Sequence, residues 1–425
     1  MKSRLLAILA ALCLYCSALS TTTSASDWPQ WRGPERNGIS SERGLLKQWP
    51  AEGPKLVWQI NDIGDGYSTP AVVGNRIYLM SNRGLDNEFV QALSTQDGKV
   101  IWTTRVGNVG NPNQEPPYPK ARSTPTVDGD LIYALGSDGD LACLETKTGK
   151  IRWQKNIRKE FGGKPGEWAY SESPLVDGDA VVVTPGGPDA TIVALNKKTG
   201  AVIWKSAVPG GDAAGYASPI AVQAAGRRQY VHFLSKGLVG VDAKTGQFLW
   251  RYAEVAKGPA QMWTPNARGE LVYAGANGVG GGLVRLKVDG SAVTPEQVYF
   301  ERGLPNGVGG AVLVGDHLYG TETGQKLVAV EFATGKVKWQ ADSIGWGSVA
   351  YADGLLYLHG VNGEVALVEA TPEAYRIKGR FKPPAQPEHK KVGPFPEGAF
   401  SYPVIANGRL YIRDLGTLWV FDIKG

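Results

Sequence analysis

Few side chains in this sequence combine the types and spacings that catalysis or metal binding uses. The histidines form no H-x-H, H-x-x-x-H or H-E-x-x-H arrangement, so the sequence predicts no histidine-rich metal site. It contains no G-x-S-x-G nucleophile elbow and no C-x-x-C-H haem-attachment motif. These patterns therefore predict neither catalytic residues nor metal ligands. The histidines are His232, His317, His359 and His389.

Aromatic and charged side chains instead gather just before a recurring proline position. Aromatic rings with an arginine and a glutamate are typical of recognition surfaces, because large rigid rings bind at low entropic cost. Packing inside the fold is an equally good explanation for each of them. The set is Tyr67, Arg122, Trp168, Tyr170, Glu172, Tyr216, Met262, Trp263, Trp346, Phe400 and Tyr402.

The recurring proline belongs to a repeated unit with a period of roughly 40–50 residues. One unit opens with Ser123-Thr124-Pro125, and five units end in the register Gly-x-x-x-Trp. Four short strands per unit predict the blade of a β-propeller, so eight proline-type positions predict an all-β, eight-bladed propeller of four-stranded antiparallel blades. The positions are Pro70, Pro125, Pro174, Pro219, Pro265, Ala311, Val349 and Pro403.

Each unit has a physical rationale. Proline lacks an N–H group and suits the start of an innermost strand, and pairs such as Asp128-Gly129 suit the tight turn that follows. Tryptophans in the fourth strands should wedge between blades, where truncating one should cost roughly 3–5 kcal/mol. Residues 298–300 and 375–381 replace this strand in units five and seven. The tryptophans are Trp58, Trp102, Trp153, Trp204, Trp250 and Trp339.

The eighth unit stops where its fourth strand should begin. Residues 54–59 have the composition of that strand and precede the first proline position. We therefore expect the N-terminal strand to complete the last blade, because closing the ring removes open strand edges. In a propeller, the connections that enter the innermost strands meet around the axis on one face, so the aromatic set is predicted to form one site at the channel mouth.

The N-terminus predicts export to the periplasm or the extracellular space. Lys2 and Arg4 precede an apolar run over 5–19 that is short for a membrane span, so we expect a signal peptide over 1–26, an extension over 27–53 and the propeller over 54–425. Cys13 and Cys16 lack the small preceding residue of a lipid-anchored protein, which leaves Cys143 as the one cysteine of the mature chain. Residues 27–34 either fold across one face of the ring or act as a structural clasp.

Charge gives little indication of a polyanionic partner. The formal charge is +5, or +3 without Lys2 and Arg4, and no nucleic-acid-reading motif is present. A basic concentration over 376–391 is explained by a solvated loop or by a docking site for an acidic partner, of which we favour the loop. We expect a monomer that is peripheral to a membrane at most.

The Gly-x-x-x-Trp strand ending and the Ser/Thr-Pro strand start resemble the pyrroloquinoline-quinone (PQQ) type of repeat. The chain is similar to exported propellers of the BamB type, in a form without the lipoprotein cysteine, and residues 28–34 resemble the opening of many bacterial members of this repeat family. The resemblance extends over nearly all of 28–425. It implies a non-catalytic binding or assembly scaffold in the cell envelope, without a cofactor, that captures envelope proteins or extended peptide segments through edge strands and the aromatic mouth.

The family also implies an alternative, a PQQ- and calcium-dependent alcohol dehydrogenase. Many such enzymes stack the quinone between a tryptophan and a disulfide of adjacent cysteines, a pair that this chain lacks, and they are typically longer. Trp263 or Trp346 would supply a stacking ring, while Glu172, Glu322 or Asp414 would supply oxygen to calcium. Between the two, we favour the scaffold.

Overall fold

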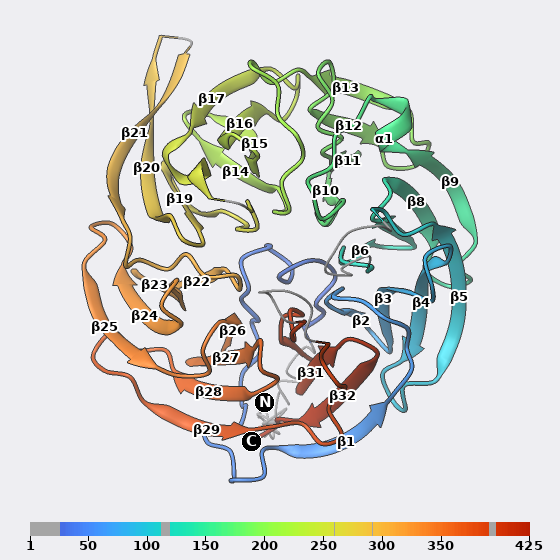
Figure 1. Cartoon of the computed structure of the whole chain (residues 1–425), viewed down its shortest axis with the longest axis vertical. Coiled ribbons are helices and arrows are strands. Elements are labelled where there is room, and N and C mark those ends of the chain that lie inside the picture. Colours follow the sequence, from blue (N-terminus) through green and yellow to red (C-terminus); the bar gives the residue numbers. More distant parts are fainter. Residues whose placement is uncertain (1–25, 112–119, 259, 291, 391–396) are drawn as a thin grey trace, which may run out of the picture.

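A computed structural model describes residues 26–111, 120–258, 260–290, 292–390 and 397–425. These residues form eight four-stranded sheets in a ring around a central axis (Figure 1). In each sheet the strands pair antiparallel with their neighbours, which confirms the predicted eight-bladed propeller. The expected signal peptide lies almost wholly outside the described residues.

The first four blades follow the chain in order from the innermost to the outermost strand. Blade 1 contains β2 (Ala71–Val73), β3 (Arg76–Asn82), β4 (Glu88–Ser94) and β5 (Val100–Gly107). Blade 2 contains β6 (Thr126–Asp128), β7 (Leu131–Leu135), β8 (Asp140–Glu145) and β9 (Ile151–Asn156). Blade 3 contains β10 (Leu175–Asp177), β11 (Ala180–Val183), β12 (Ile192–Asn196) and β13 (Val202–Ser206). Blade 4 contains β14 (Ile220–Ala224), β15 (Arg227–Leu234), β16 (Gly237–Asp242) and β17 (Phe248–Tyr252).

The last four blades repeat this order, except that the outermost strand of blade 8 comes from the N-terminal part of the chain. Blade 5 contains β18 (Asn266–Arg268), β19 (Leu271–Ala276), β20 (Gly280–Asp289) and β21 (Ala292–Glu301). Blade 6 contains β22 (Ala311–Val314), β23 (His317–Thr321), β24 (Lys326–Glu331) and β25 (Val337–Asp342). Blade 7 contains β26 (Gly347–Ala352), β27 (Leu355–Gly360), β28 (Val365–Glu369) and β29 (Ile377–Phe381). Blade 8 contains β30 (Val404–Ala406), β31 (Arg409–Asp414), β32 (Thr417–Asp422) and β1 (Lys55–Ile60).

Within the described residues, two short helices lie between the strands. They are α1 (Ile157–Glu160) and the 3₁₀ helix η1 (Glu254–Lys257). Within the described ranges, no helix is long and apolar enough to cross a membrane.

The indole of each fourth-strand tryptophan fastens one blade to the next in most of the ring. Trp102 Nε1 in blade 1 donates a hydrogen bond of 3.1 Å to the carbonyl of Thr146, in the turn between β8 and β9 of blade 2. The turn glycine Gly149 packs beneath the same indole, since a Cβ there would lie 2.5 Å from the ring. The equivalent indole-to-carbonyl bonds join Trp58 to Thr95, Trp153 to Lys197, Trp204 to Ala243 and Trp339 to Thr371.

Three blade interfaces depart from this pattern. Tyr299 takes the place of tryptophan in blade 5 and donates its hydroxyl to the Phe332 carbonyl of blade 6 at 2.8 Å. Trp250 Nε1 bonds to Gln229 within blade 4, where the next blade carries the long β20–β21 hairpin in place of a tight turn (Figure 1). Blades 7 and 8 meet through the rings of Phe381 and Phe421, whose centroids are 5.0 Å apart.

Serine and threonine before the proline positions link blades at the axis. Thr124 N donates to Ser173 Oγ, Ser173 N to Ser218 Oγ, and Tyr402 N to Thr69 Oγ1 at 2.9, 2.9 and 3.0 Å. These bonds run from one blade to the next and satisfy N–H groups that no sheet partner reaches. The recurring Ser/Thr-Pro opening therefore has a structural role in the ring.

All eight outermost strands carry a β-bulge at the same place. In β5 the register shifts between Leu93↔Val100 and Ala92↔Trp102, which leaves Ile101 unpaired and 43% exposed. A bulge bends an edge strand and increases its twist, so the outer edges are poor templates for an added strand. The residues left out of register are Val57, Ile101, Arg152, Ile203, Leu249, Val298, Lys338 and Lys378.

The ring closes as predicted, by antiparallel pairing of β1 with β32. Arg413 reinforces this closure from β31: its buried guanidinium donates to the carbonyls of Ser68 and Met80 in the blade 1 part of the chain at 2.9 and 2.7 Å. Burial lowers the pKa of Arg413 to about 9. The seam between the two ends of the propeller is therefore held by backbone pairing and by a buried side chain.

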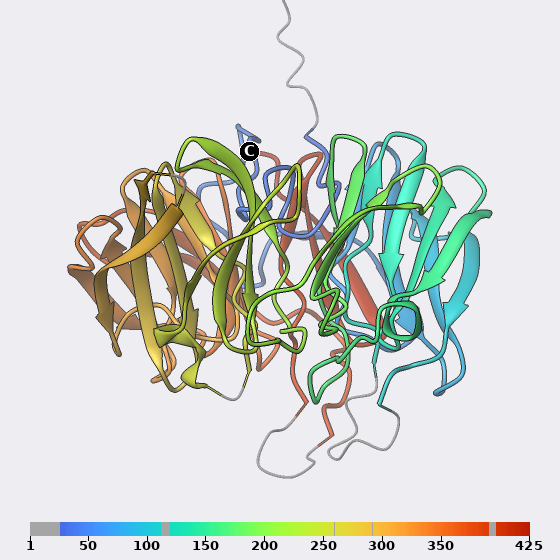
Figure 2. The same ribbon diagram turned by 90° about the horizontal axis from the view of Figure 1, so that it is seen from above.

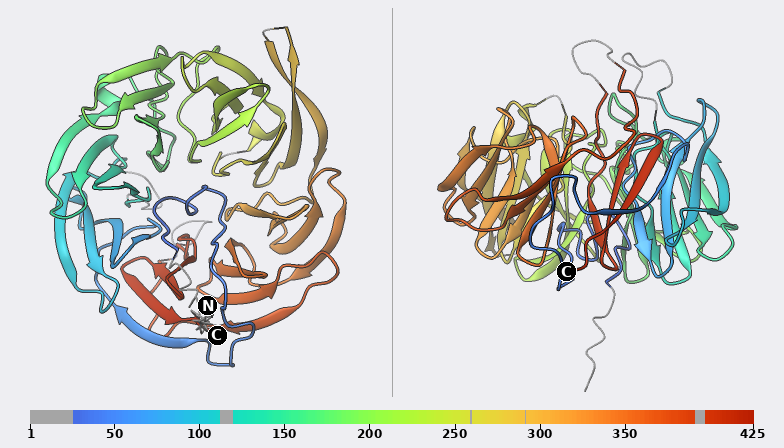
Figure 3. Two further views of the ribbon diagram at one scale, coloured as in Figure 1. Left: turned by 180° about the vertical axis from the view of Figure 1, so that it is seen from behind. Right: turned by 90° about the horizontal axis from the view of Figure 1, so that it is seen from below.

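The extension before β1 clasps one face of the ring. Trp28 exchanges two backbone hydrogen bonds with Val72 of blade 1, at 2.7 and 2.8 Å. Farther along, Arg36 donates to the carbonyls of Ser173 and Pro174 near blade 3, and Gly38 accepts from Tyr351 N of blade 7. Side views show the extension and the C-terminus on the same face (Figures 2 and 3). The contacts at blades 1, 3 and 7 show that residues 28–38 cross this face as a clasp.

Candidate binding site at the channel mouth

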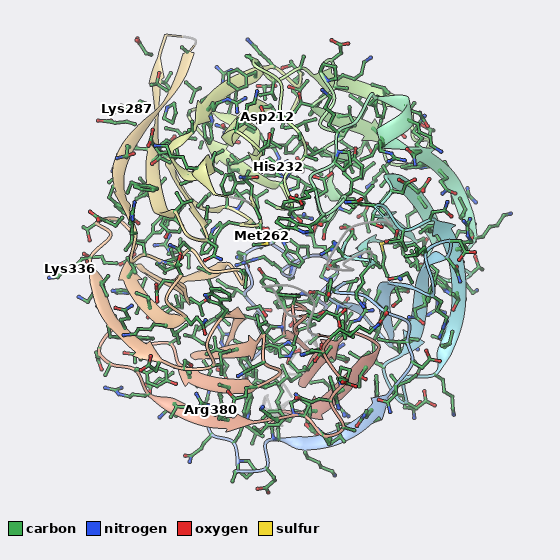
Figure 4. The ribbon with its side chains drawn as sticks, viewed as in Figure 1. Asp212, His232, Met262, Lys287, Lys336 and Arg380 are labelled. Atoms are coloured by element: carbon green, nitrogen blue, oxygen red, sulfur yellow. The ribbon has the colours of Figure 1, made fainter. Side chains whose placement is uncertain are left out.

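The loops that enter the innermost strands lie on the face opposite the extension. The extension contacts the turns between first and second strands, for example through Asp27 with Gly74 N and Glu42 with Gly408 N. The extension thus covers the channel on that side, and the described loops that enter the innermost strands lie on the other. Met262 stands near the axis in Figure 4, whereas Lys287, Lys336 and Arg380 stand at the rim.

Five of the predicted mouth residues come together on one side of the axis. Tyr67 and Phe400 meet edge to face with centroids 5.3 Å apart, and Trp168 and Tyr216 lie 5.3 Å apart. The Arg122 guanidinium lies over the Tyr67 ring at 5.3 Å. Trp168, Tyr216 and Phe400 are half-buried, so part of each ring faces solvent. Because these residues enter blades 1, 2, 3, 4 and 8, one surface spans five blades.

A leucine that sequence reasoning did not single out completes this cluster. Leu415, in the turn between β31 and β32, packs with Tyr67, Trp168 and Phe400 and is 6% exposed. Its φ of +46° lies in the left-handed region, which a bulky side chain rarely adopts. Ala169, beside Trp168, has a φ of +65°. Backbone strain of this kind often accompanies ligand-binding loops, and here it shapes both sides of the cluster. We name Tyr67, Arg122, Trp168, Tyr216, Phe400 and Leu415 the mouth cluster.

Partly buried ion pairs link the loops of the mouth. Lys120 Nζ lies 3.1 Å from Asp65 and 3.3 Å from Glu397, which ties the connection into blade 2 to the connection into blade 8. His389 Nε2 lies 2.9 Å from the buried Asp414, and this hydrogen bond raises the pKa of His389. No spacing in the sequence indicated these pairs, since their partners are 25 or more residues apart and recur in no other repeat.

The other predicted mouth residues lie apart from the cluster. Tyr170 and Trp263 are 1% and 2% exposed in the cores between blades, as packing residues. Tyr402 contacts Trp31 and Arg32 of the extension. Trp346 lies in the connection into blade 7, where its Nε1 donates to the Thr323 carbonyl of blade 6 at 3.1 Å.

Two buried carboxyl groups lie behind the mouth. Glu172 Oε1 accepts from Thr184 N, and burial raises the pKa of Glu172 to about 7. Its neighbour His232 is bonded to Thr184 and to the Ala217 carbonyl, and burial lowers the pKa of His232 to about 4. Glu88 accepts two hydrogen bonds of 2.8 Å from Ser137, and burial raises its pKa to about 8. All three groups are fully enclosed, so no substrate reaches them directly.

A groove adjoins the mouth cluster and runs over the loops of blades 1 and 2 to the connection into blade 3. Its two parts measure about 260 and 660 Å³ and share Asn111, Asp138 and Arg158. Glu167 and Ala169, on either side of Trp168, line the smaller part. The groove is therefore continuous with the loop that carries the mouth tryptophan.

Most of the residues proposed for a quinone and calcium site make other contacts in this structure. Trp263 belongs to the packed core with Tyr273, whose ring centroid is 5.8 Å away. The proposed calcium carboxylates accept hydrogen bonds from protein donors: Glu322 from Gly324 N and Lys326 N, and Asp414 from His389. Glu172 accepts from Thr184 N through Oε1 alone, and its buried Oε2 lies 3.7 Å from His232 Nε2 without a hydrogen-bond partner. Among the described residues, no group of three or more His, Cys, Asp or Glu side chains is placed to hold a metal ion.

Comparison with known proteins supports the propeller assignment. The family described as outer membrane protein assembly factor BamB matches residues 36–169 and 86–341. The BamB of Yersinia pestis is 26% identical over 239 residues, which cover 52% of this chain and 55% of that protein. Across the first three curated relatives, the match covers 28% to 55% of the relative's length.

Two solved structures share the fold. BamB from Moraxella catarrhalis superposes with a TM-score of 0.61 at 18% identity, covering 87% of this chain and 100% of that one. Quinohemoprotein alcohol dehydrogenase from Comamonas testosteroni superposes with a TM-score of 0.61 at 14% identity, covering 94% and 81%. At these identities the likeness concerns the fold alone. Together with the family match over more than half of its residues, the repeats and the ring show that this chain belongs to the PQQ-repeat propeller family described as outer membrane protein assembly factor BamB.

Proposed function

We propose that this protein is an exported, non-catalytic scaffold of the cell envelope that binds extended segments of other envelope proteins at its channel mouth. The observation that carries the proposal is the mouth cluster, in which rings from several blades meet with part of their surface exposed. Aromatic and arginine side chains dominate binding energy at protein interfaces, which makes this cluster the best recognition surface among the described residues.

The mouth is also favoured as the binding site because the outermost strands, which form the rim of the ring, are poorly suited to strand addition. Strand addition needs a regular edge with free N–H and C=O groups. Each outer edge is bulged at the same position, so capture of a partner strand along the rim is disfavoured. We therefore place the partner on the loop face, and we propose that the protein acts as a monomer in the periplasm or outside the cell, peripheral to a membrane at most.

Affinity capture from envelope extracts tests this proposal. Wild type should enrich a defined partner, and a Trp168→Ala, Tyr216→Ala double variant should reduce that enrichment at least tenfold. A Val202→Ser, Ile203→Ser double variant is the matched control, because these rim side chains are 45% and 49% exposed. Equal enrichment by the mouth variant and wild type, with both proteins folded, would contradict the proposal.

The alternative function, a PQQ- and calcium-dependent dehydrogenase, requires that the protein bind PQQ and calcium. It rests on the fold shared with the quinohemoprotein, while the engaged carboxylates and the buried Trp263 speak against it. Calorimetric titration of the folded protein with PQQ and calcium should give no saturable heat. Binding at micromolar or tighter affinity would favour the enzyme.

A further inference from the structure

The groove beside the mouth cluster has a wall built by backbone and side-chain hydrogen bonds. Val109 N donates to the Leu85 carbonyl at 2.9 Å, and Gly110 N donates to Ser137 Oγ at 2.8 Å. Asn111 Nδ2 donates to the Glu167 carbonyl, which ties the connection into blade 2 to the connection into blade 3. A preformed groove binds without the entropic cost of ordering its walls.

The lining of the groove is apolar at one end and carries charged side chains along the rest. Leu85 is 46% exposed at one end, beside the buried Val109. Beyond these apolar side chains, three carboxylates and one guanidinium line the groove: Asp86, Asp138, Glu167 and Arg158. An apolar strip that leads to carboxylates suits the stem and the head of a lysine or arginine side chain.

The charges of the groove are not balanced internally. Arg158 is paired with Asp138 at 2.7 Å, while Asp86 and Glu167 form no ion pair within the part of the chain that the structure describes. Arg105 stands beside the Asp86 end, where its guanidinium is bound to the Asp86 carbonyl and to Asn108 Oδ1. Asp86 and Glu167 are exposed, so both carboxylates are accessible to a cation that enters the groove from outside.

We infer that the bound segment carries a basic side chain that occupies this groove while a neighbouring apolar side chain covers the mouth cluster. The inference rests on the proposed function, because it concerns the same partner and adds its charge. The occupant is an extended polypeptide, because Glu167 and Ala169 of the groove lie on either side of Trp168 of the mouth cluster, so neighbouring side chains of one segment can reach both. Charge pairs at such partly exposed sites fix orientation and select partners more than they add affinity.

Three model peptides test the inference. Each is an acetylated, amidated Gly-Ser decapeptide with one central phenylalanine and two flanking positions that hold lysine, glutamine or glutamate. Fluorescence anisotropy should give the tightest Kd for the lysine peptide and the weakest for the glutamate peptide, at least threefold apart at low salt. Higher ionic strength should reduce that ratio. Equal affinity for the lysine and glutamate peptides, or binding of neither, would overturn the inference.

Variants separate the groove from the mouth. An Asp86→Asn, Glu167→Gln double variant should lose the preference for lysine while its Kd for the glutamine peptide stays unchanged. A Glu52→Gln, Asp179→Asn variant removes two exposed carboxylates outside the groove and should keep the preference. Trp168→Ala should weaken all three peptides by the same factor; if it weakens none, the proposed mouth fails. A lysine preference that survives in the groove variant would place the acidic site elsewhere and overturn the inference.

Discussion

At the scale of single residues, each standard blade interface depends on one large ring and one missing side chain. The Trp102 indole lies over Gly149 of the next blade, and the same relation holds for Trp58 over Gly98, with a Cβ-to-ring distance of 2.9 Å. The turn glycine therefore serves twice, by adopting a positive φ and by leaving room for the ring. The repeated Gly-x-x-x-Trp pattern therefore reflects two needs: a turn with positive φ, and space beside that turn for the tryptophan of the preceding blade.

Replacing Gly149 by alanine should be much more costly than replacing a turn glycine in open space. Gly149 has a φ of +72° and its Cβ would meet Trp102, whereas Gly178 has a φ of +58° with nothing within 4 Å. Gly178→Ala should cost about 1–2 kcal/mol of unfolding free energy from the left-handed conformation alone. Gly149→Ala should cost about 1–3 kcal/mol more, because the added methyl group overpacks the interface. Equal denaturant midpoints for the two variants would contradict the indole–glycine interface.

Glu88 should make stability fall as the pH rises. Burial holds its folded pKa at about 8, above the ordinary value of 4.5, so the folded state keeps a proton that the unfolded chain loses. The resulting stabilisation is complete below pH 4.5 and disappears as the pH rises through about 8, at most about 1.4 kcal/mol per pH unit.

Glu88→Gln keeps a neutral acceptor for Ser137 and removes this titration. Melting temperatures at pH 5, 7 and 9 should show wild type losing stability relative to the variant as the pH rises. Parallel curves for the two proteins would show that Glu88 does not titrate in this range.

Sequence reasoning at this scale succeeded where a residue recurs. The fourth-strand tryptophans are repeated, so their positions between blades followed from the pattern, although Trp250 bonds within its own blade. Leu415 was missed because leucine is not a regular feature of the equivalent turns in the other blades, and its contact with Tyr67 joins residues far apart in the chain. Conversely, Tyr170 and Trp263 share their position before a proline with mouth residues but point into the cores.

At the scale of elements, β1 and the clasp close the ring in different ways. β1 covers the edge of β32, whose residues Leu418, Trp419, Val420 and Phe421 are at most 1% exposed. The clasp before β1 crosses the face and contacts blades 1, 3 and 7. Loss of β1 would expose an apolar strand edge, which is a template for aggregation.

Two truncated chains separate these roles. A mature chain that begins at Pro54 lacks the clasp and keeps β1, whereas one that begins at Asn61 lacks both. The first should unfold at a lower temperature than wild type, and the second should melt lower still and aggregate in size-exclusion chromatography. Identical melting temperatures for the chain from Asn61 and wild type would show that closure lies elsewhere.

The strands and turns that repeat regularly along the sequence could be predicted, and those that depart from the repeat could not. Prolines at strand starts and Asp-Gly turns indicated where each blade lies. The absence of a fourth strand in the last unit predicted that an N-terminal strand closes the ring. The bulges were not predicted, because a run such as Val100-Ile101-Trp102 reads as a continuous strand and only the pairing reveals the shift. The length of the β20–β21 hairpin was not predicted either. Blade 5 has neither the tight turn nor the tryptophan that marks the boundary between third and fourth strands in other blades.

At the scale of the whole molecule, the ring has two different faces. The clasp covers one of them, and the loops into blades 1 to 4 and 8 build the mouth cluster on the other. A repeat pattern predicts that such loops meet, because every blade presents the same end to the axis. It does not predict which loops contribute rings to the mouth cluster. The rings gather on one side of the axis, while Trp346 lies apart from them. The site is thus set by loop lengths and ion pairs that differ from blade to blade.

Site-specific photocrosslinking tests the central claim most directly. A photoreactive phenylalanine derivative would replace Phe400 or Tyr216 in the mouth, Ile377 at the rim, or Glu52 before β1. We predict that the mouth positions crosslink to the same envelope protein, at a segment with a basic residue, and that Ile377 and Glu52 give no such product. Crosslinking of that protein from the rim or from Glu52, with none from the mouth, would contradict the account.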